Sequence, residues 1–210
     1  MRKYEIVIFD FDGTLADTFD WFKVAINKAA EKYHFRVLSE ADMEQLRDKK
    51  TREIMRFLGV AWWKMPFIAR YMRGLMWEEV SHIKLFSGIK ELLLTLKSKD
   101  IKVVVLSSNS FKNVRSVLGE ELLDTIQHLE CGISILGKKE KLKKVLKKFH
   151  VLPENAIAIG DETRDIEAAR SLRIVSGAVN WGYSTPKALE NEKPDFIFPD
   201  VPSLVHALDF

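Results

Sequence analysis

Two hydrophobic patterns divide the chain into strands and helices. Short apolar runs rich in Val and Ile indicate buried strands, and apolar residues repeated every three or four positions indicate amphipathic helices. The expected strands cover residues 4–9, 101–106, 127–129 (within an ambiguous segment, 125–136), 156–159, 173–179 and 195–198. The expected helices cover residues 17–33, 51–58, 65–80, 89–97, 112–118, 139–149, 163–171 and 204–208, with a further helix beginning near Ser39. Because strands and helices alternate from residue 87 onwards, the pattern predicts an α/β fold with a mostly parallel sheet and helices on both faces.

The stretch between the first strand and residue 84 has a different character. It is rich in aromatic residues and Met at helical spacing and contains four of the expected helices, the third and fourth separated by Gly59 and by Trp62-Trp63. These patterns predict a small helical domain, residues 16–83, inserted into an α/β core formed by residues 1–15 and 84–210. We interpret its large apolar side chains as the core of this bundle rather than a cofactor-binding surface, because such residues usually pack against one another.

Length and composition agree with a globular core that carries an insert. The chain has 210 residues, of which 47% are hydrophobic and 30% charged, so it can bury a substantial core. Its single cysteine, Cys131, excludes an internal disulfide and a metal site built from several cysteines. No apolar run approaches the ~20 residues of a membrane span, and the first strand follows Met1 too closely to leave room for a cleaved signal peptide. We therefore expect a cytoplasmic protein without a membrane partner.

The charge of the chain argues against a nucleic-acid partner. The formal net charge is only +3. The basic run from Lys138 to Lys148 has Leu142 and Val145 on one side, which predicts an ordinary helix with one solvated face. A locally positive pocket suited to an anionic substrate is compatible with this charge.

The residues that follow the first strand carry the strongest chemical signal. The string Asp10-Phe11-Asp12-Gly13-Thr14 places two carboxyl groups at the carboxyl end of the strand, where open α/β sheets bind ligands. Side chains alternate along an extended segment, so both carboxylates can point the same way while Phe11 turns aside. Two such charges repel each other unless a metal ion neutralises them or one holds a proton. We therefore assign Asp10 as a nucleophile and magnesium ligand, and Asp12 as a general acid and base.

This string resembles the signature of the haloacid dehalogenase-like (HAD) hydrolase superfamily, and three later segments resemble its other motifs. Ser108-Asn109 follows an apolar strand, Gly137-Lys138 begins a helix, and residues 160–165 (Gly-Asp-Glu-Thr-Arg-Asp) follow another strand. The resemblance covers nearly the whole chain and implies a Rossmann-like core. The helical insert directly after the first motif matches the subgroup with a small helical cap, which includes phosphoglycolate phosphatases and β-phosphoglucomutases.

The resemblance implies roles for the charged residues of these motifs. Asp161 would complete a Mg²⁺ site with the Asp10 carboxylate and the backbone carbonyl of Asp12, since oxygen ligands are those that this ion prefers. Lys138 would pair with the substrate phosphate and the site carboxylates during catalysis. Asp165 would bind a metal-bound water or orient Lys138.

The same resemblance implies that Ser108, Asn109 and Gly13 bind the phosphate. A serine hydroxyl and backbone N–H groups at a strand end can donate hydrogen bonds to phosphoryl oxygens. Ser107, one position earlier, is the alternative for the hydroxyl. Ser108 or Ser110 could instead cap the helix that follows.

Two further assignments have alternatives. Lys139 and Lys141 lie close enough to Lys138 in the sequence to take its place. Glu162 is either another acid near the metal or an ordinary first-turn residue that the helix dipole favours.

The activity implied by the resemblance is Mg²⁺-dependent hydrolysis of a small phosphorylated metabolite through an aspartyl-phosphate. The acid at Asp12 argues against dehalogenases and phosphonatases, which lack it. A phosphomutase of the β-phosphoglucomutase type and a non-catalytic HAD-fold binding module are the alternatives. The Asp-Gly-Thr form favours a phosphatase, and the presence of every motif acid argues against a silent module. In the cap, Arg52 is a candidate for binding a second anionic group of the substrate, such as a carboxylate.

Overall fold

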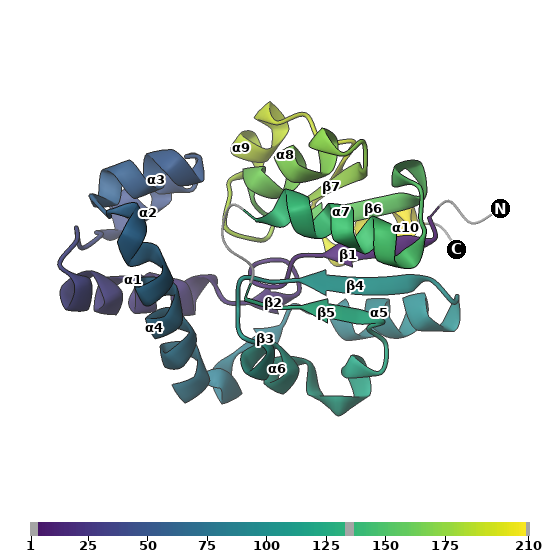
Figure 1. Cartoon of the computed structure of the whole chain (residues 1–210), viewed down its shortest axis with the longest axis horizontal. Helices are drawn as coiled ribbons and strands as arrows, with labels where there is room; N and C mark the ends of the chain where they lie inside the picture. The colour runs from purple at the N-terminus through teal and green to yellow at the C-terminus, as the bar shows by residue number, and fades with distance from the viewer. Residues whose placement is uncertain (1–3, 133–136, 209–210) are drawn as a thin grey trace.

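One sheet lies at the centre of the molecule, and its inner strands are rich in apolar, β-branched residues. The computed structural model describes residues 4–132 and 137–208. The strands of this sheet are β1 (Ile6–Phe9), β4 (Lys102–Leu106), β5 (His128–Glu130), β6 (Ala156–Gly160), β7 (Val175–Val179) and β8 (Phe196–Phe198). They lie in the order β5-β4-β1-β6-β7-β8, and each neighbouring pair is parallel (Figure 1). The predicted fold class is confirmed.

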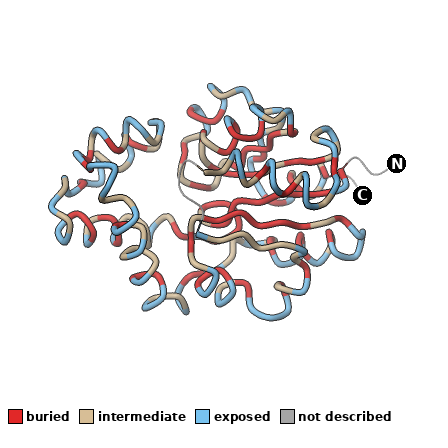
Figure 2. Tube along the Cα trace, in the orientation of Figure 1, coloured by how far each residue is buried: buried red, intermediate tan, exposed pale blue. Residues whose placement is uncertain are grey.

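Helices cover both faces of the sheet because successive strand residues point to opposite sides. On β1, Val7 and Phe9 belong to one apolar cluster, whereas Ile6 and Ile8 belong to another. The first cluster is covered by α5 (Ile89–Ser98), α6 (Phe111–Leu123) and α10 (Val201–Ala207), and the second by α7 (Lys138–Phe149) and α8 (Thr163–Ser171), beside which α9 (Pro186–Asn191) packs. Figure 2 shows the central strands β1, β4 and β6 as the most continuously buried part of the chain.

The order of the strands determines where the site lies. From β1 the chain adds β4 and β5 on one side and then crosses to place β6, β7 and β8 on the other. The direction of the strand order therefore reverses beside β1, and such switch points are where open α/β sheets bind ligands at the carboxyl ends of their strands. The segments that follow β1, β4 and β6 meet there.

The cap consists of α1 (Phe19–Tyr33), α2 (Glu40–Leu46), α3 (Thr51–Leu58) and α4 (Met65–Glu78), with short 3₁₀ turns at Trp62–Lys64 and Val80–His82. Its apolar residues form a cluster of their own, as the helical spacing predicts. The helix start predicted near Ser39 is a capping box, in which the Ser39 hydroxyl accepts from the Asp42 N–H and the Asp42 carboxylate accepts from the Ser39 N–H.

Two short strands connect the cap to the core. β2 (Ala16–Asp17) and β3 (Lys84–Leu85) pair antiparallel and fall at the two predicted junctions of the insert. Two-residue strands are too short to produce a periodic pattern, so the sequence did not indicate them.

Other elements differ from the prediction at their ends. α6 runs to Leu123 rather than ending at residue 118, with a break at Gly119 (φ 70°) that interrupts the apolar pattern. β7 begins at Val175 rather than at Arg173, because Arg173 has a positive φ of 58° and belongs to a turn. α9 was not predicted. β5 lies within the ambiguous segment 125–136, of which residues 133–136 are outside the described residues.

Within residues 4–132 and 137–208, none of the helices combines the length and the apolar character that crossing a membrane requires.

Candidate active site

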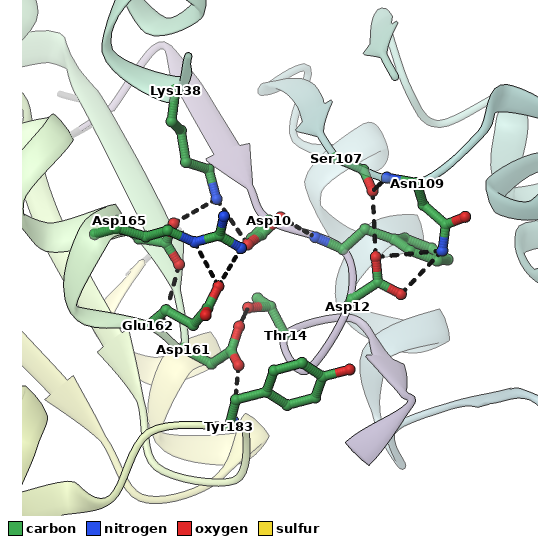
Figure 3. Close-up of polar contacts among 12 residues, drawn as sticks. Asp10, Asp12, Thr14, Ser107, Asn109, Lys138, Asp161, Glu162, Asp165 and Tyr183 are labelled. Carbon is green, nitrogen blue, oxygen red and sulfur yellow. Dashed lines mark hydrogen bonds and ion pairs between the residues drawn. The ribbon is translucent and has the colours of Figure 1, made fainter. Parts of the chain in front are cut away.

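Asp10 lies at the end of the central strand and is paired with Lys138. Its backbone N–H donates to the Ile159 carbonyl of β6 (2.9 Å), so the backbone of Asp10 still belongs to the sheet. Its carboxylate Oδ2 lies 2.7 Å from Lys138 Nζ, which is also 2.5 Å from Asp165 Oδ1 (Figure 3). Burial raises the pKa of Asp10, and the positive charge of Lys138 offsets part of this effect. The lysine thus bridges two buried acids.

Asp12 is held by a different set of partners. Asn109 Nδ2 donates to its Oδ1 (3.1 Å), and the Ser107 hydroxyl donates to its Oδ2 (3.4 Å). Figure 3 shows the Asp12 carboxylate turned toward these two residues, while that of Asp10 is turned toward Lys138. Burial and the nearby charge of Asp10 raise the pKa of Asp12 to about 7. The two acids therefore lie close together but in separate environments.

A tight turn over residues 11–16 follows Asp10, includes Asp12 and lies against Asp161. The N–H groups of Leu15 and Ala16 both donate to the Phe11 carbonyl (2.9 Å each), so the extended alternation ends after Asp10. Gly13 has φ +77°, and a Cβ atom there would lie 2.2 Å from Asp161 Oδ2. Both the conformation and the close approach therefore require glycine.

Asp161 follows β6 and is fully buried. The Thr14 hydroxyl donates to its Oδ1 (2.7 Å), and the Tyr183 N–H donates to its Oδ2 (2.8 Å). Burial and the neighbouring charge of Glu162 raise the pKa of Asp161 well above its ordinary value. Such a carboxyl group is costly to ionise unless a cation is bound beside it.

Three carboxyl groups are placed to hold a cation. Oxygen atoms of Asp10, Glu162 and Asp165 lie within 4.8 Å of one another. Carboxylate oxygens are ligands that Mg²⁺ accepts in proteins, so the chemistry of these groups suits the ion. Two of the three carboxylates, those of Asp10 and Asp165, are already paired with Lys138. The group shares Asp10 with the predicted ligand set, whereas the role of Asp161 as a ligand stays a prediction. Glu162 also accepts from Arg164 Nε (2.6 Å), which places a second cation at the edge of the cluster.

Lys138 reaches the acids from the first residue of α7. A positive charge at a helix N-terminus opposes the helix dipole. The attraction of Asp10 and Asp165 outweighs both this effect and burial, and the pKa of Lys138 is raised. Of the two alternatives, Lys139 is exposed and Lys141 pairs with Glu130 on β5.

The serines after β4 have distinct partners. The Ser107 hydroxyl accepts from the Asn109 N–H (2.9 Å) and faces Asp12, whereas Ser110 caps α6. The Ser108 carbonyl accepts from Arg73 Nη1 of the cap (3.2 Å), and the residue is half-buried. The capping alternative is confirmed for Ser110, and phosphate binding by Ser108, Asn109 and Gly13 stays a prediction.

Arg52, the predicted substrate-binding residue of the cap, and Arg47, which contacts the core, have different surroundings. Arg52 is exposed on α3, where it lines a surface hollow of about 440 Å³ together with Arg56 and Trp62. Arg47 instead donates from Nε to the Tyr183 carbonyl (2.9 Å).

Sequence reasoning missed Arg47, Tyr183, Thr14 and Arg164. Arg164 carried a usable signal, because a cation in the first turn of α8 opposes the helix dipole just as Lys138 does. Thr14 lies within the string of residues 10–14, but nothing in the sequence marked its hydroxyl as a partner of Asp161. Arg47 and Tyr183 are distant in sequence, and nothing near either residue indicates that the two make contact.

A Rossmann-like core, a helical cap and a lysine-bridged acid pair at the end of the central strand define a capped α/β enzyme. Residues 7–179 match the sequence profile described as haloacid dehalogenase-like hydrolase. The chain belongs to this family of hydrolases.

The similarity to relatives in sequence and structure extends over nearly the whole chain. A phosphoglycolate phosphatase from Synechococcus elongatus is 30% identical over 205 residues, which cover 97% of each chain. A phosphoglycolate phosphatase from Vibrio cholerae is 25% identical over 225 residues, covering 99% of this chain and 98% of the relative. The structure of CbbY from Rhodobacter sphaeroides in complex with phosphate superposes with a TM-score of 0.79 at 21% identity, covering 99% of this chain and 100% of CbbY. These two sequence relatives are phosphatases, and the structural similarity to CbbY concerns the fold.

Proposed function

We propose that the protein is a Mg²⁺-dependent phosphatase that hydrolyses a small phosphorylated metabolite resembling phosphoglycolate. The observation that carries this proposal is the bridge from Lys138 to Asp10 and Asp165 at the end of the central strand, with Asp12 held apart by Asn109. The names of the two sequence relatives support the phosphoglycolate-like substrate.

The proposed reaction has two steps that use different acids. In the first, an Asp10 oxygen attacks phosphorus, the ester P–O bond breaks, and the Asp12 carboxyl gives its proton to the leaving oxygen. In the second, the Asp12 carboxylate takes a proton from water as the water oxygen attacks phosphorus, and the bond to Asp10 breaks to release inorganic phosphate. The separate hydrogen bonds of the two acids suit these separate roles.

Lys138 would hold the phosphoryl oxygens together with Ser108, Asn109 and Gly13. The ion would be held by Asp10, by the Asp12 carbonyl and by Asp161, with Asp165 nearby. When bound, Mg²⁺ supplies positive charge that stabilises the transferring phosphoryl group.

The charges of the site support dependence on a divalent cation. Five carboxyl groups and two cationic side chains gather at the ends of β1, α7 and β6: Asp10, Asp12, Asp161, Glu162 and Asp165, with Lys138 and Arg164. A phosphate dianion would be repelled by this excess of acids. We therefore expect removal of divalent ions with EDTA to abolish phosphate release.

A screen of phosphorylated metabolites for phosphate release with Mg²⁺ tests the proposal. We expect release from phosphoglycolate and from p-nitrophenyl phosphate, and loss of both with EDTA. Transfer of phosphate between two sugar carbons without net release would instead identify a phosphomutase. Absence of turnover with every ester would favour a binding module.

The proposed role of Arg52 gives a separate prediction. If its guanidinium binds a substrate carboxylate, Arg52→Ala should raise KM for phosphoglycolate by about tenfold, since one charge-assisted contact is lost. KM for p-nitrophenyl phosphate, which has no carboxylate, should change less than about twofold. Steady-state kinetics on both esters measures the difference, and equal effects on the two would remove Arg52 from the substrate site.

A further inference from the structure

Arg47 of the cap contacts the loop that covers Asp161. It lies at the C-terminal end of α2, and its side chain is 23% exposed. Its Nε donates to the Tyr183 carbonyl (2.9 Å), and its Nη2 donates to the Gly182 carbonyl (3.3 Å). The guanidinium is itself held by Glu44 (3.1 Å) and lies over the Phe19 ring (4.9 Å to its centre). One cap residue thus reaches two successive carbonyls of a core loop.

The same peptide unit connects Arg47 to Asp161. The Gly182 carbonyl accepts from Arg47, and the Tyr183 N–H of that peptide donates to Asp161 Oδ2 (2.8 Å). A peptide bond is planar, so its C=O and N–H cannot turn independently. Rotating this plane would weaken both hydrogen bonds, and hydrogen bonds at the two ends of one amide strengthen each other.

The position at 182 allows this arrangement only with glycine. A Cβ atom there would lie 2.2 Å from Asp161 Cβ and 2.4 Å from Oδ2. The backbone of the loop therefore packs directly on the acid. The Tyr183 ring packs against Phe19 and Phe22 of the cap, at 5.3 and 5.2 Å between ring centres. Cap and acid contact opposite sides of the same short segment.

We propose that Arg47 is a positioning residue for Asp161: through the peptide between Gly182 and Tyr183, the seated cap fixes the orientation of this carboxylate. The inference rests on the proposed function where it concerns catalysis, and on the geometry alone where it concerns the peptide. Thr14 holds Oδ1 of the acid independently, so the inference predicts that the hydrogen bond to Oδ2 weakens when Arg47 no longer binds the loop.

Amide hydrogen exchange in the full-length protein tests the contact directly. In Arg47→Met, the Tyr183 N–H should exchange at least about tenfold faster than in the wild type, because charge-assisted hydrogen bonds are lost. Arg47→Lys keeps the charge but cannot bind both carbonyls in the geometry of a guanidinium. Its Tyr183 N–H should exchange at a rate between those of the wild type and Arg47→Met. Lys50→Met is the matched control. Lys50 also joins cap to core, through Glu167 (2.6 Å) and Glu192 (2.7 Å), but among the described residues no hydrogen bond links it to the loop. Lys50→Met should change the exchange rate of the Tyr183 N–H by less than about threefold.

Two further measurements separate this inference from the proposed function. Mn²⁺ affinity, followed by electron paramagnetic resonance without substrate, should fall about tenfold in Arg47→Met and stay near the wild type in Lys50→Met. The kcat for p-nitrophenyl phosphate should likewise fall in Arg47→Met and stay near the wild-type value in Lys50→Met. If the wild type releases no phosphate, the proposed function fails while the exchange and Mn²⁺ measurements still decide the inference. Wild-type protection of the Tyr183 N–H in Arg47→Met, equal loss in Lys50→Met, or unchanged Mn²⁺ affinity would each overturn it.

Discussion

Asp10→Asn is expected to lower the rate of phosphate release from p-nitrophenyl phosphate by at least about a thousandfold, because an amide cannot replace a carboxylate nucleophile. The loss should appear in kcat with Mg²⁺ saturating. The substitution removes one charge from a buried group of acids in which burial raises the pKa of Asp10. We therefore expect the melting temperature without metal to be equal to or higher than that of the wild type.

A cap aspartate supplies the control for this experiment. Asp20 has an 89% exposed side chain and pairs with Lys23 on the same helix. Asp20→Asn should change the rate by less than about twofold. If Asp10→Asn kept more than about a tenth of the wild-type rate while remaining folded, Asp10 would not be the nucleophile.

Lys138→Met should lower both activity and stability. Its ammonium group bridges Asp10 and Asp165, so its loss should reduce kcat/KM by about a hundredfold or more. It should also lower the free energy of unfolding by about 3 kcal/mol at pH 7.5, because a buried ion pair loses one partner. The raised pKa of Lys138 means that the folded protein favours the charged ammonium, so losing this group lowers the free energy of unfolding. The ammonium contributes its full stabilisation below the unfolded pKa of about 10.4, and this is lost as pH rises through the folded value.

Urea unfolding of Lys138→Met with EDTA and with Mg²⁺ measures this effect. Lys139→Met, which removes an exposed charge from the same helical turn, should stay within about 0.5 kcal/mol of the wild type. Similar stabilities for the two variants would show that the bridge contributes little to folding.

Most of the fold was predictable because its signals are local. The strand β1, the capping box at Ser39 and the helix α3 each follow from a few adjacent residues. The errors fall where tertiary structure outweighs local pattern. β2 is too short for a period, and it forms because β3 lies beside it. The extension of α6 beyond Gly119 could not be predicted from an apolar pattern that this glycine interrupts.

The candidate site also contains residues that the local sequence indicates and contacts that it does not. Asp10 was assigned because it ends a strand, and Lys138 and Asp165 because their segments resemble motifs of the HAD superfamily. The structure brings these three residues together. The contact of Arg47 with Tyr183 spans 136 residues of sequence, and no pattern around either residue links one to the other. Such a contact exists only because the cap folds back over the sheet, so one sequence alone could not indicate it.

The antiparallel pair of β2 and β3, where the chain enters and leaves the cap, makes it feasible to exchange the cap for another domain. Because Ala16 lies opposite Leu85, cutting the chain at this ribbon would leave two ends of the core next to each other. A foreign helical bundle could be grafted there without rebuilding the sheet or its acids. If Arg47 acts as we propose, a successful graft would need to bring its own donor for the carbonyls of Gly182 and Tyr183.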